Sequence, residues 1–483
     1  MIMTRIYSIL LSIVLVCSMQ AADVLPVTGS WINLFYQDVR NKYSNPKDMD
    51  NTDPALWRAK VREMHNMGVE YIVFMAVANE GKAVYPSKIM PLGYNSDRES
   101  PVSAILDEAS SLGMKAFLSI GWAENQDDNL RIPAILNRQK EIMAELAEIY
   151  RDCPAFYGWY LPVEDCLGPV LTDAAVVAVN NLVERAHSLT PGKKTLISPY
   201  GFFRSEFNNP RFGTQIERLK VDIIAYQDEV GCVREKFPMP RLKMAWKKMR
   251  EIHNRTGIEF WANCELFTWG VGTNSRESAL IPAAFPRVLS QLVAATDGGV
   301  ERIISFMTCG IWSLGNDGYS LGQPSLSKCA ATDYMAWRNG DRRWKLLEAS
   351  MRGELKSLCG NGSILTDGII GEETPEDTAW QQFKPGANTI EIPTGSAEAS
   401  SVFLRFLNCA KKGIGLPYKV YLYAGDDSDH CTLVSVSDVE QFPNKLHDTW
   451  IDCVELHFPS GARHVKVVLQ STTNVALDEV YIL

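Results

Sequence analysis

The feature that most constrains the fold is an alternation of short apolar runs with longer helical patterns, repeated from Gly29 to about residue 306. Short buried strands that alternate with helices form a parallel sheet, because each helix returns the chain to the same edge. Eight such runs predict a closed (β/α)8 barrel, a fold of roughly 250 residues. An open doubly wound sheet is the alternative, but no G-x-G-x-x-G turn follows the first run. The predicted strands are Ser30–Phe35, Tyr71–Val77, Ala116–Ile120, Phe156–Tyr160, Thr195–Ser198, Asp222–Ala225, Phe260–Asn263 and Arg302–Phe306.

Helical patterns separate these strands, and several end at a residue suited to the last turn of a helix. Gly68, Gly113 and Asn254 stand at such ends, where Gly and Asn are favoured. A closing helix around Tyr334–Leu355 completes the region. The other predicted helices are Ala55–Met67, Val102–Leu112, Arg138–Tyr150, Ala174–Ser188, Asn209–Leu219, Arg241–Asn254 and Ala284–Thr296.

After Gly360 the pattern changes, and residues 361–483 contain no helical period of any length. Short alternating runs between turns are typical of an all-β sandwich or jelly roll. We therefore predict a signal peptide at 1–22, a barrel domain at 23–357 and a β-sandwich at 358–483. The predicted sandwich strands are Ser401–Leu407, Lys419–Ala424, Cys431–Ser435, Trp450–Phe458, Val465–Gln470 and Val480–Leu483.

The first twenty-two residues have the features of a signal peptide. Arg5 supplies positive charge, the run from Ile6 to Cys17 is apolar, and the small residues Ala21 and Ala22 follow. We expect an exported protein, periplasmic or extracellular, with a lipid anchor at Cys17 as the alternative. No later segment is apolar enough to span a membrane. The net charge of −9 argues against a nucleic-acid partner.

Several other chemistries have no motif in this chain. It contains no G-x-S-x-G, no H-E-x-x-H and no P-loop, so we expect neither a cofactor nor a catalytic metal. The irregular cysteine spacings favour buried free thiols, with one bridge among Cys409, Cys431 and Cys453 as the alternative. The acidic turn 426–429 has calcium-binding side chains, but a solvated turn is the favoured interpretation.

Two glutamates close apolar runs that lie about three strand–helix units apart. Glu164 ends the run from Phe156, and Glu265 ends the run from Ile258. In a barrel these runs are strands four and seven, whose carboxyl ends meet at the mouth where active sites are built. A facing pair of carboxylates is what glycosidic bond cleavage requires. We therefore predict Glu164 and Glu265 as the catalytic residues of a glycoside hydrolase, with Asp228 and Glu229 as rival acids.

Polar and aromatic side chains follow the other strands too. Such a rim suits an oligosaccharide or polysaccharide, because sugar faces stack on rings and hydroxyls need hydrogen-bond partners. We expect the opposite strand ends to lack aromatic side chains of this kind. The predicted substrate-binding residues are Tyr36, Gln37, Glu80, Trp122, Glu124, Tyr200, Tyr226, Gln227, Asp228, Glu229, Asn263 and Trp312.

Three motifs, Trp31–Asn33, Gly158–Glu164 and Phe260–Glu265, resemble a family of secreted glycoside-hydrolase-like barrels of gut bacteria. Many members of that family are known only as a domain of unknown function. More distantly, the region is similar to the clan A retaining glycosidases. That likeness implies Glu164 as acid/base, Glu265 as nucleophile, Tyr226 beside the nucleophile, and retention of the anomeric configuration.

One residue departs from the clan A pattern, because Val163 stands where those enzymes have an Asn for the sugar 2-hydroxyl. The departure supports an alternative function, a non-catalytic glycan-binding protein that keeps the cleft. A third possibility is a partner-binding protein whose barrel mouth is plugged. The C-terminal region resembles a galactose-binding-like or discoidin-type sandwich through Leu365–Gly368, Ala462–Val468 and Ala476–Val480, which implies sugar binding or bracing of the barrel.

Overall fold

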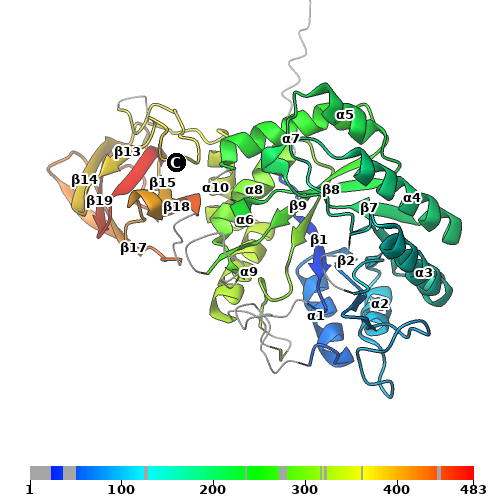
Figure 1. Cartoon of the computed structure of the whole chain (residues 1–483). Helices are drawn as coiled ribbons and strands as arrows, with labels where there is room; N and C mark the ends of the chain where they lie inside the picture. The colour runs from blue at the N-terminus through cyan, green and yellow to red at the C-terminus, as the bar shows by residue number, and fades with distance from the viewer. Residues whose placement is uncertain are drawn as a thin grey trace, which may run out of the picture.

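The barrel is confirmed in a computed structural model, in which eight parallel strands close in the order β1-β12-β9-β8-β7-β6-β5-β2 (Figure 1). Each predicted strand overlaps one of them. The structure describes residues 23–35, 50–124, 129–233, 237–270, 280–315, 318–319, 324–359, 363–442 and 448–483. The strands are β1 (Val27–Ile32), β2 (Tyr71–Phe74), β5 (Lys115–Ser119), β6 (Phe156–Tyr160), β7 (Lys194–Ile197), β8 (Ile223–Gln227), β9 (Glu259–Glu265) and β12 (Arg302–Phe306).

Helices surround the barrel, and their starts follow from local sequence. Asp53 accepts a hydrogen bond from the Ala55 N–H at the start of α1 (Pro54–Asn66), and Pro54 supplies the fixed φ of a first helical residue. Ser100 does the same for α2 (Pro101–Ser111). The other helices of the barrel region are α3 (Pro133–Tyr150), α4 (Asp173–Leu189), the 3-10 turn η1 (Phe202–Arg204), α5 (Pro210–Glu217), α6 (Val230–Val233), α7 (Met239–His253) and α8 (Phe285–Asp297).

The single closing helix predicted around residues 334–355 is wrong, because two helices occupy this region. They are α9 (Pro324–Arg338) and α10 (Arg342–Met351). Gly340 between them has a φ of 83°, which glycine adopts without steric cost. The next residue, Asp341, accepts a hydrogen bond from the Trp344 N–H and starts α10. The helical period continues across the break, which is why the pattern alone predicts one helix.

Two short hairpins extend the loops beyond the strand ends. The first is β3 (Ala78–Asn79) with β4 (Lys82–Ala83), and the second is β10 (Phe267–Trp269) with β11 (Leu280–Pro282). The second hairpin follows the strand that ends at Glu265. It therefore extends the chain directly beyond one of the two predicted catalytic residues.

The C-terminal region is an antiparallel sandwich of two four-stranded sheets, β13-β20-β15-β18 and β14-β19-β16-β17. The first two strands were not predicted, since most of their side chains are partly or fully exposed and only Ile390 and Ile392 alternate inward. The sandwich contains η2 (Ala410–Lys412), and its strands are β13 (Gln381–Phe383), β14 (Gly386–Pro393), β15 (Ser401–Cys409), β16 (Lys419–Gly425), β17 (Cys431–Asp438), β18 (Thr449–His457), β19 (His464–Ser471) and β20 (Val475–Ile482).

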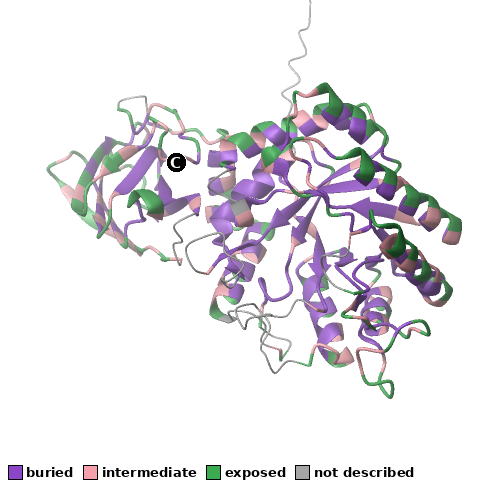
Figure 2. Cartoon of the chain, viewed as in Figure 1, coloured by how far each residue is buried: buried purple, intermediate pink, exposed green. Residues whose placement is uncertain are grey.

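The sandwich packs on one side of the barrel, where β18 lies against α8 and α10 (Figure 1). Phe403, Leu407 and Ile451 of the sandwich belong to the same hydrophobic cluster as the barrel core. Arg343 of α10 also pairs with Asp452 of β18 at 3.1 Å. Figure 2 shows the barrel strands buried and the outer faces of several helices exposed. The two regions therefore share a continuous apolar contact.

The cysteine and membrane predictions concern the same described residues. All ten cysteines there are free thiols, so the alternative of a bridge among Cys409, Cys431 and Cys453 is wrong. Within those ranges, no helix has both the length and the apolar character that a membrane span requires. The signal peptide prediction lies at 1–22, outside the described residues, and the domain limits stay a prediction.

Candidate active site

A cavity of about 500 Å³ lies at the carboxyl ends of the barrel strands. Its walls come from the segments that follow β5, β6, β7 and β8 and from the end of β9. The barrel mouth is therefore open, whereas the partner-binding alternative predicts a plugged mouth. The predicted site residues in its wall are Trp122, Glu164, Tyr200, Gln227, Glu229 and Glu265.

Glu164 stands on the solvent side of this cleft. It follows β6 by four residues, and its side chain is exposed. Gln227, the last residue of β8, donates a hydrogen bond from Nε2 to Glu164 Oε1 at 3.3 Å. The same amide nitrogen donates to the Ser198 carbonyl at 2.9 Å. Gln227 is thus held by the backbone after β7 and orients the Glu164 carboxylate.

Glu265 stands at the bottom of the cleft, as the last residue of β9, and only 4% of it is exposed. Its Oε2 accepts the backbone N–H of Cys232 in α6 at 2.7 Å. A Cβ atom at Gly231 would lie 3.0 Å from that oxygen and 2.5 Å from the Phe267 carbonyl oxygen. Glycine at this position therefore lets α6 approach the carboxyl group closely enough to donate.

Three buried acids meet at this point, and each is harder to ionise than usual. Burial raises the pKa of Glu265 to about 8, and the charges of Asp228 and Glu229 add to the shift. Burial also raises the pKa of Glu229 to about 7, against the effect of the N–H groups of residues 201–203. Burial raises the pKa of Asp228 as well. All three groups therefore hold their protons to a higher pH than a solvated carboxyl group does.

Two residues of the cleft have left-handed backbone conformations that residues other than glycine rarely adopt. Glu229 has a φ of 55° and Trp122 has a φ of 66°. A left-handed residue other than Gly, Asn or Asp costs about 1–3 kcal/mol, and such strain is concentrated at functional sites. Both residues line the cavity.

The predicted substrate-binding residues Tyr226 and Trp312 are packed inside the protein, away from the cleft. Tyr226 is fully buried behind the barrel wall, where its hydroxyl is 2.9 Å from Nε2 of His253 on α7. Successive strand residues point to opposite faces, so Gln227 points to the cleft and Tyr226 away from it. Trp312 is also fully buried, with its ring 4.5 Å from the ring of Tyr334. Its position after the last strand gave no sign of this packing.

Asp228 and Asn263 lie beneath the cleft and do not line it. Asp228 is fully buried, and Asn263 is 2% exposed. Asn263 donates from Nδ2 to Ser198 Oγ at 3.1 Å. Both residues therefore support the strand ends that carry Gln227 and Glu265.

The remaining predicted residues come from the first three strands. Glu80 and Glu124 are exposed, and their loops are joined by a hydrogen bond from the Glu80 N–H to the Glu124 carbonyl at 2.7 Å. Neither lines the cavity described above. Tyr36 and Gln37 fall outside the described residues.

Sequence reasoning missed one ion pair in the cleft wall. Arg131 and Asp165 both line the cavity and pair at 3.3 Å. Asp165 also accepts a hydrogen bond from Thr172 Oγ1 at 2.7 Å. Asp165 directly follows Glu164, which was an available signal. Arg131 follows no strand, and only the folded loop brings it to the cleft.

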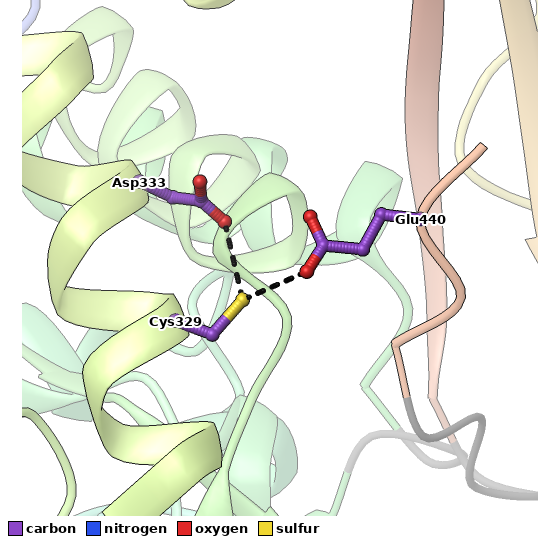
Figure 3. A group of neighbouring side chains, drawn as sticks. All are labelled: Cys329, Asp333 and Glu440. Carbon is purple, nitrogen blue, oxygen red and sulfur yellow. Dashed lines mark hydrogen bonds between the residues drawn. The ribbon is translucent and has the colours of Figure 1, made fainter. Parts of the chain in front are cut away.

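One group of side chains among the described residues has the geometry of a metal site, and it lies away from the cleft. Cys329 and Asp333 of α9 face Glu440, which follows β17 in the sandwich, and their ligand atoms lie within 4.8 Å of one another (Figure 3). The Cys329 thiol donates to Glu440 Oε1 at 3.2 Å. Burial and the Glu440 charge raise the pKa of Asp333 to about 7. The hydrogen bond joins the two domains.

The sequence of the barrel matches a known family. The family described as "Domain of unknown function (DUF4434)" matches residues 27–316, more than half of the chain. The chain belongs to this family. The matched residues include all eight barrel strands and every residue that lines the cleft. No curated protein matches the chain in sequence.

Solved structures of glycoside-hydrolase type resemble this DUF4434 chain. A candidate α-L-fucosidase from Bacteroides thetaiotaomicron is 18% identical, with a TM-score of 0.53 over 67% of this chain and 95% of the other. A glycoside hydrolase family 5 protein from Bacteroides vulgatus is 11% identical, with a TM-score of 0.39 over 86% of each chain. An endo-1,4-β-mannanase from Rhizomucor miehei is 12% identical, with a TM-score of 0.41 over 62% and 94%. At these identities the first likeness supports the fold alone, and the other two carry no argument.

Proposed function

We propose that the chain is an exported glycoside hydrolase that cleaves its substrate between Glu164 and Glu265. The observation that carries the proposal is one cavity of about 500 Å³ that holds an exposed carboxyl group and a buried one whose pKa is raised. Glycosidic cleavage needs a proton donor at the glycosidic oxygen and a second carboxylate near the anomeric carbon. Environments that push two carboxyl groups apart in pKa provide these two roles in one site.

In this proposal Glu265 donates the proton to the leaving oxygen. Its raised pKa, about 8, leaves the proton in place at pH 7, since burial beside Asp228 and Glu229 opposes ionisation. Glu164, which accepts a hydrogen bond from Gln227, is the second carboxylate and attacks the anomeric carbon. These roles are the reverse of those that the clan A resemblance implies, because a nucleophile must be ionised before it attacks.

The covalent glycosyl intermediate on Glu164 is then hydrolysed. Glu265, deprotonated in the first step, takes a proton from the attacking water and regains its starting state. Two inversions at the same carbon restore the original configuration. The proposal therefore keeps the predicted retention of the anomeric configuration.

The walls of the cleft suit a carbohydrate substrate. Trp122 and Tyr200 offer ring faces, and Gln227, Arg131 and Asp165 offer hydrogen-bonding groups around the carboxyl pair. Sugars present both kinds of surface, apolar faces and hydroxyl edges. We propose an oligosaccharide or polysaccharide as the substrate, in line with export of the chain.

The proposal is tested by screening the mature chain against aryl glycosides and oligosaccharides of varied sugar and linkage. Hydrolysis of one class, lost in Glu164→Gln and in Glu265→Gln, supports it. The first-formed product, followed by NMR, has the anomeric configuration of the substrate if retention holds. Equal turnover in wild type and both variants would reject the catalytic pair.

A glycan-binding protein without turnover is the second candidate, and Val163 is the observation that favours it. Val163 lines the cleft beside Glu164 and offers no hydrogen bond from its side chain. Calorimetric titration with those oligosaccharides of the screen that the wild-type chain does not hydrolyse separates the two functions. Binding in wild type and both Gln variants, without hydrolysis in any, assigns the chain to this second class.

A further inference from the structure

An arginine joins the acids of the cleft to the sandwich domain. Arg287 of α8 is fully buried, and its Nη2 donates to the carbonyl oxygens of Glu265 at 2.9 Å and Phe267 at 2.8 Å. Its Nη1 lies 4.0 Å from Oδ1 of Asp448. Asp448 directly precedes β18 and is only 2% exposed. The sandwich thus places an acidic side chain against the cation that holds the end of β9.

A second side chain of α8 completes the network. Gln291, one turn after Arg287, donates from Nε2 to Asp228 Oδ2 at 2.6 Å and to the Glu265 carbonyl at 3.1 Å. Asp228 Oδ1 accepts the backbone N–H of Glu265 at 3.1 Å. Both the N–H and the carbonyl of Glu265 are therefore fixed by buried side chains. None of the three fixing groups lies on β9 itself.

We propose that the sandwich completes the active site, with Asp448 as a positioning residue that holds Arg287 against the strand end carrying Glu265. Asp448 acts through Arg287 and does not line the cleft. The catalytic part of this inference, that Asp448 supports turnover, rests on the proposed function. The network of contacts stands on the geometry alone.

Charge gives this arrangement its physical reason. A buried guanidinium without a nearby anion is costly, so Arg287 needs a counterion in this apolar contact. Asp448 supplies one from the other domain. The charged and titratable groups around the Asp228–Glu265 pair are Glu229, Cys232, Cys264 and Arg287, with Asp448 behind Arg287. Arg287 lowers the pKa of Asp228. In the proposed arrangement the negative charge of Asp448 offsets part of this effect of Arg287.

The experiment measures the titration of these carboxyl groups in the full-length mature chain, without substrate. The infrared band of protonated carboxyl groups is followed against pH, and the Asp228–Glu265 signal is identified as the difference from Glu265→Gln. Asp448→Asn removes one negative charge beside Arg287, so the positive charge of Arg287 acts more strongly on the Asp228–Glu265 pair, and the pair titrates at lower pH. We expect a fall of about one pH unit.

A matched control comes from the same interface. Asp452 pairs with Arg343 at 3.1 Å between the same two domains, but neither residue contacts the cleft acids. Asp452→Asn should therefore leave the titration of the pair unchanged. Asp448→Glu, which keeps the charge, should restore most of the wild-type midpoint.

The outcomes separate this inference from the proposed function. A shifted midpoint in Asp448→Asn, absent in Asp452→Asn, supports the positioning role even if no substrate is hydrolysed. With an active substrate, Asp448→Asn should lower kcat about tenfold and leave KM within twofold, because the lost contacts hold Glu265 and not the sugar. Identical titration in Asp448→Asn and wild type overturns the inference, as does an equal shift in the Asp452→Asn control.

Discussion

The two ends of the barrel are made by the same eight strands but carry different side chains. Toward the amino-terminal end, Tyr71 lies 5.3 Å from Trp261 and Phe117 lies 5.3 Å from Tyr157, ring to ring. At the carboxyl end, the acids Glu164, Glu229 and Glu265 line a cavity of about 500 Å³. One end is filled by aromatic rings, whereas the other keeps an open cleft, with Glu164 exposed and Glu229 and Glu265 buried in its wall.

This difference corrects a prediction made from the sequence. The strand ends opposite the site were expected to lack aromatic side chains, yet they contribute a cluster of their own. Lys115 lies 5.0 Å from the ring centre of Tyr71, and Arg302 lies 4.5 Å from the same ring. Rings packed among themselves and under cations stabilise a barrel. An aromatic residue near a strand end therefore indicates a binding site only when it lies at the carboxyl end of the strand.

The largest expected effect is on turnover, at the carboxyl end. Glu164→Gln and Glu265→Gln should each lower kcat by about 10²–10⁴-fold, because each removes one of the two carboxyl roles. Glu259→Gln is a matched control on the same strand, since Glu259 starts β9 and pairs with Lys194 at 3.2 Å. Its turnover should stay within twofold of wild type. Steady-state kinetics on the substrate found by screening measure kcat for each variant. An equal loss of kcat in all three variants would contradict the assignment of catalysis to the carboxyl end of the barrel.

The next effect is on stability, at the amino-terminal end. Trp261→Ala removes a fully buried ring that contacts Tyr71 and Phe117, and should cost about 3–5 kcal/mol of unfolding free energy. Denaturant titration measures this loss. At temperatures where the variant is folded, its kcat should match wild type. A tenfold lower kcat in the folded variant would show that the two ends are not independent.

The third effect ties stability to pH through the cleft. The folded pKa of Glu265, about 8, lies above its ordinary value of 4.5, so the folded state holds the proton more tightly than the unfolded chain. Stability from this group is complete below about pH 4.5 and is lost as pH rises through about 8. Thermal unfolding between pH 5 and 9 should show a fall of about 4 kcal/mol from this group in wild type. Glu265→Gln should remove that part of the slope, and an unchanged slope would contradict the raised pKa.

The smallest effect concerns a cation at the aromatic end. Lys115→Met loses contacts with the rings of Tyr71 at 5.0 Å and Tyr157 at 4.9 Å, which should cost about 0.5–1 kcal/mol. Lys88→Met is the control, because Lys88 is 80% exposed and its pair with Glu148 at 3.4 Å is a surface contact. Equal denaturation midpoints for the two variants would mean that the ring contacts of Lys115 add nothing.

Much of the fold could be predicted, because strand and helix periods are local properties. The β6 run from Phe156 to Tyr160 and the β12 run from Arg302 to Phe306 match their observed bounds. The misses have local causes as well. β14 carries mostly exposed residues, and the break before α10 depends on one glycine inside a continuous helical pattern.

The candidate site divides in the same way. Glu164, Gln227 and Glu265 lie where strand ends predict them, since every carboxyl end of a parallel barrel meets the same mouth. Tyr226 and Trp312 could not be placed, because one position along a strand or loop decides which face a side chain joins. Arg131 could not be found, because it reaches the cleft from a loop without periodic pattern.

The sequence by itself determined that the chain forms a barrel with Glu164 and Glu265 at its mouth, through patterns that each span only a few residues. Only the tertiary structure decided that Glu265 is buried and that its pKa is raised. Glu265 meets Asp228, Arg287 and Gln291 from other elements, and Asp448 stands behind them from another domain. A pKa depends on burial and on nearby charges, and those are fixed only when segments far apart in the chain come together.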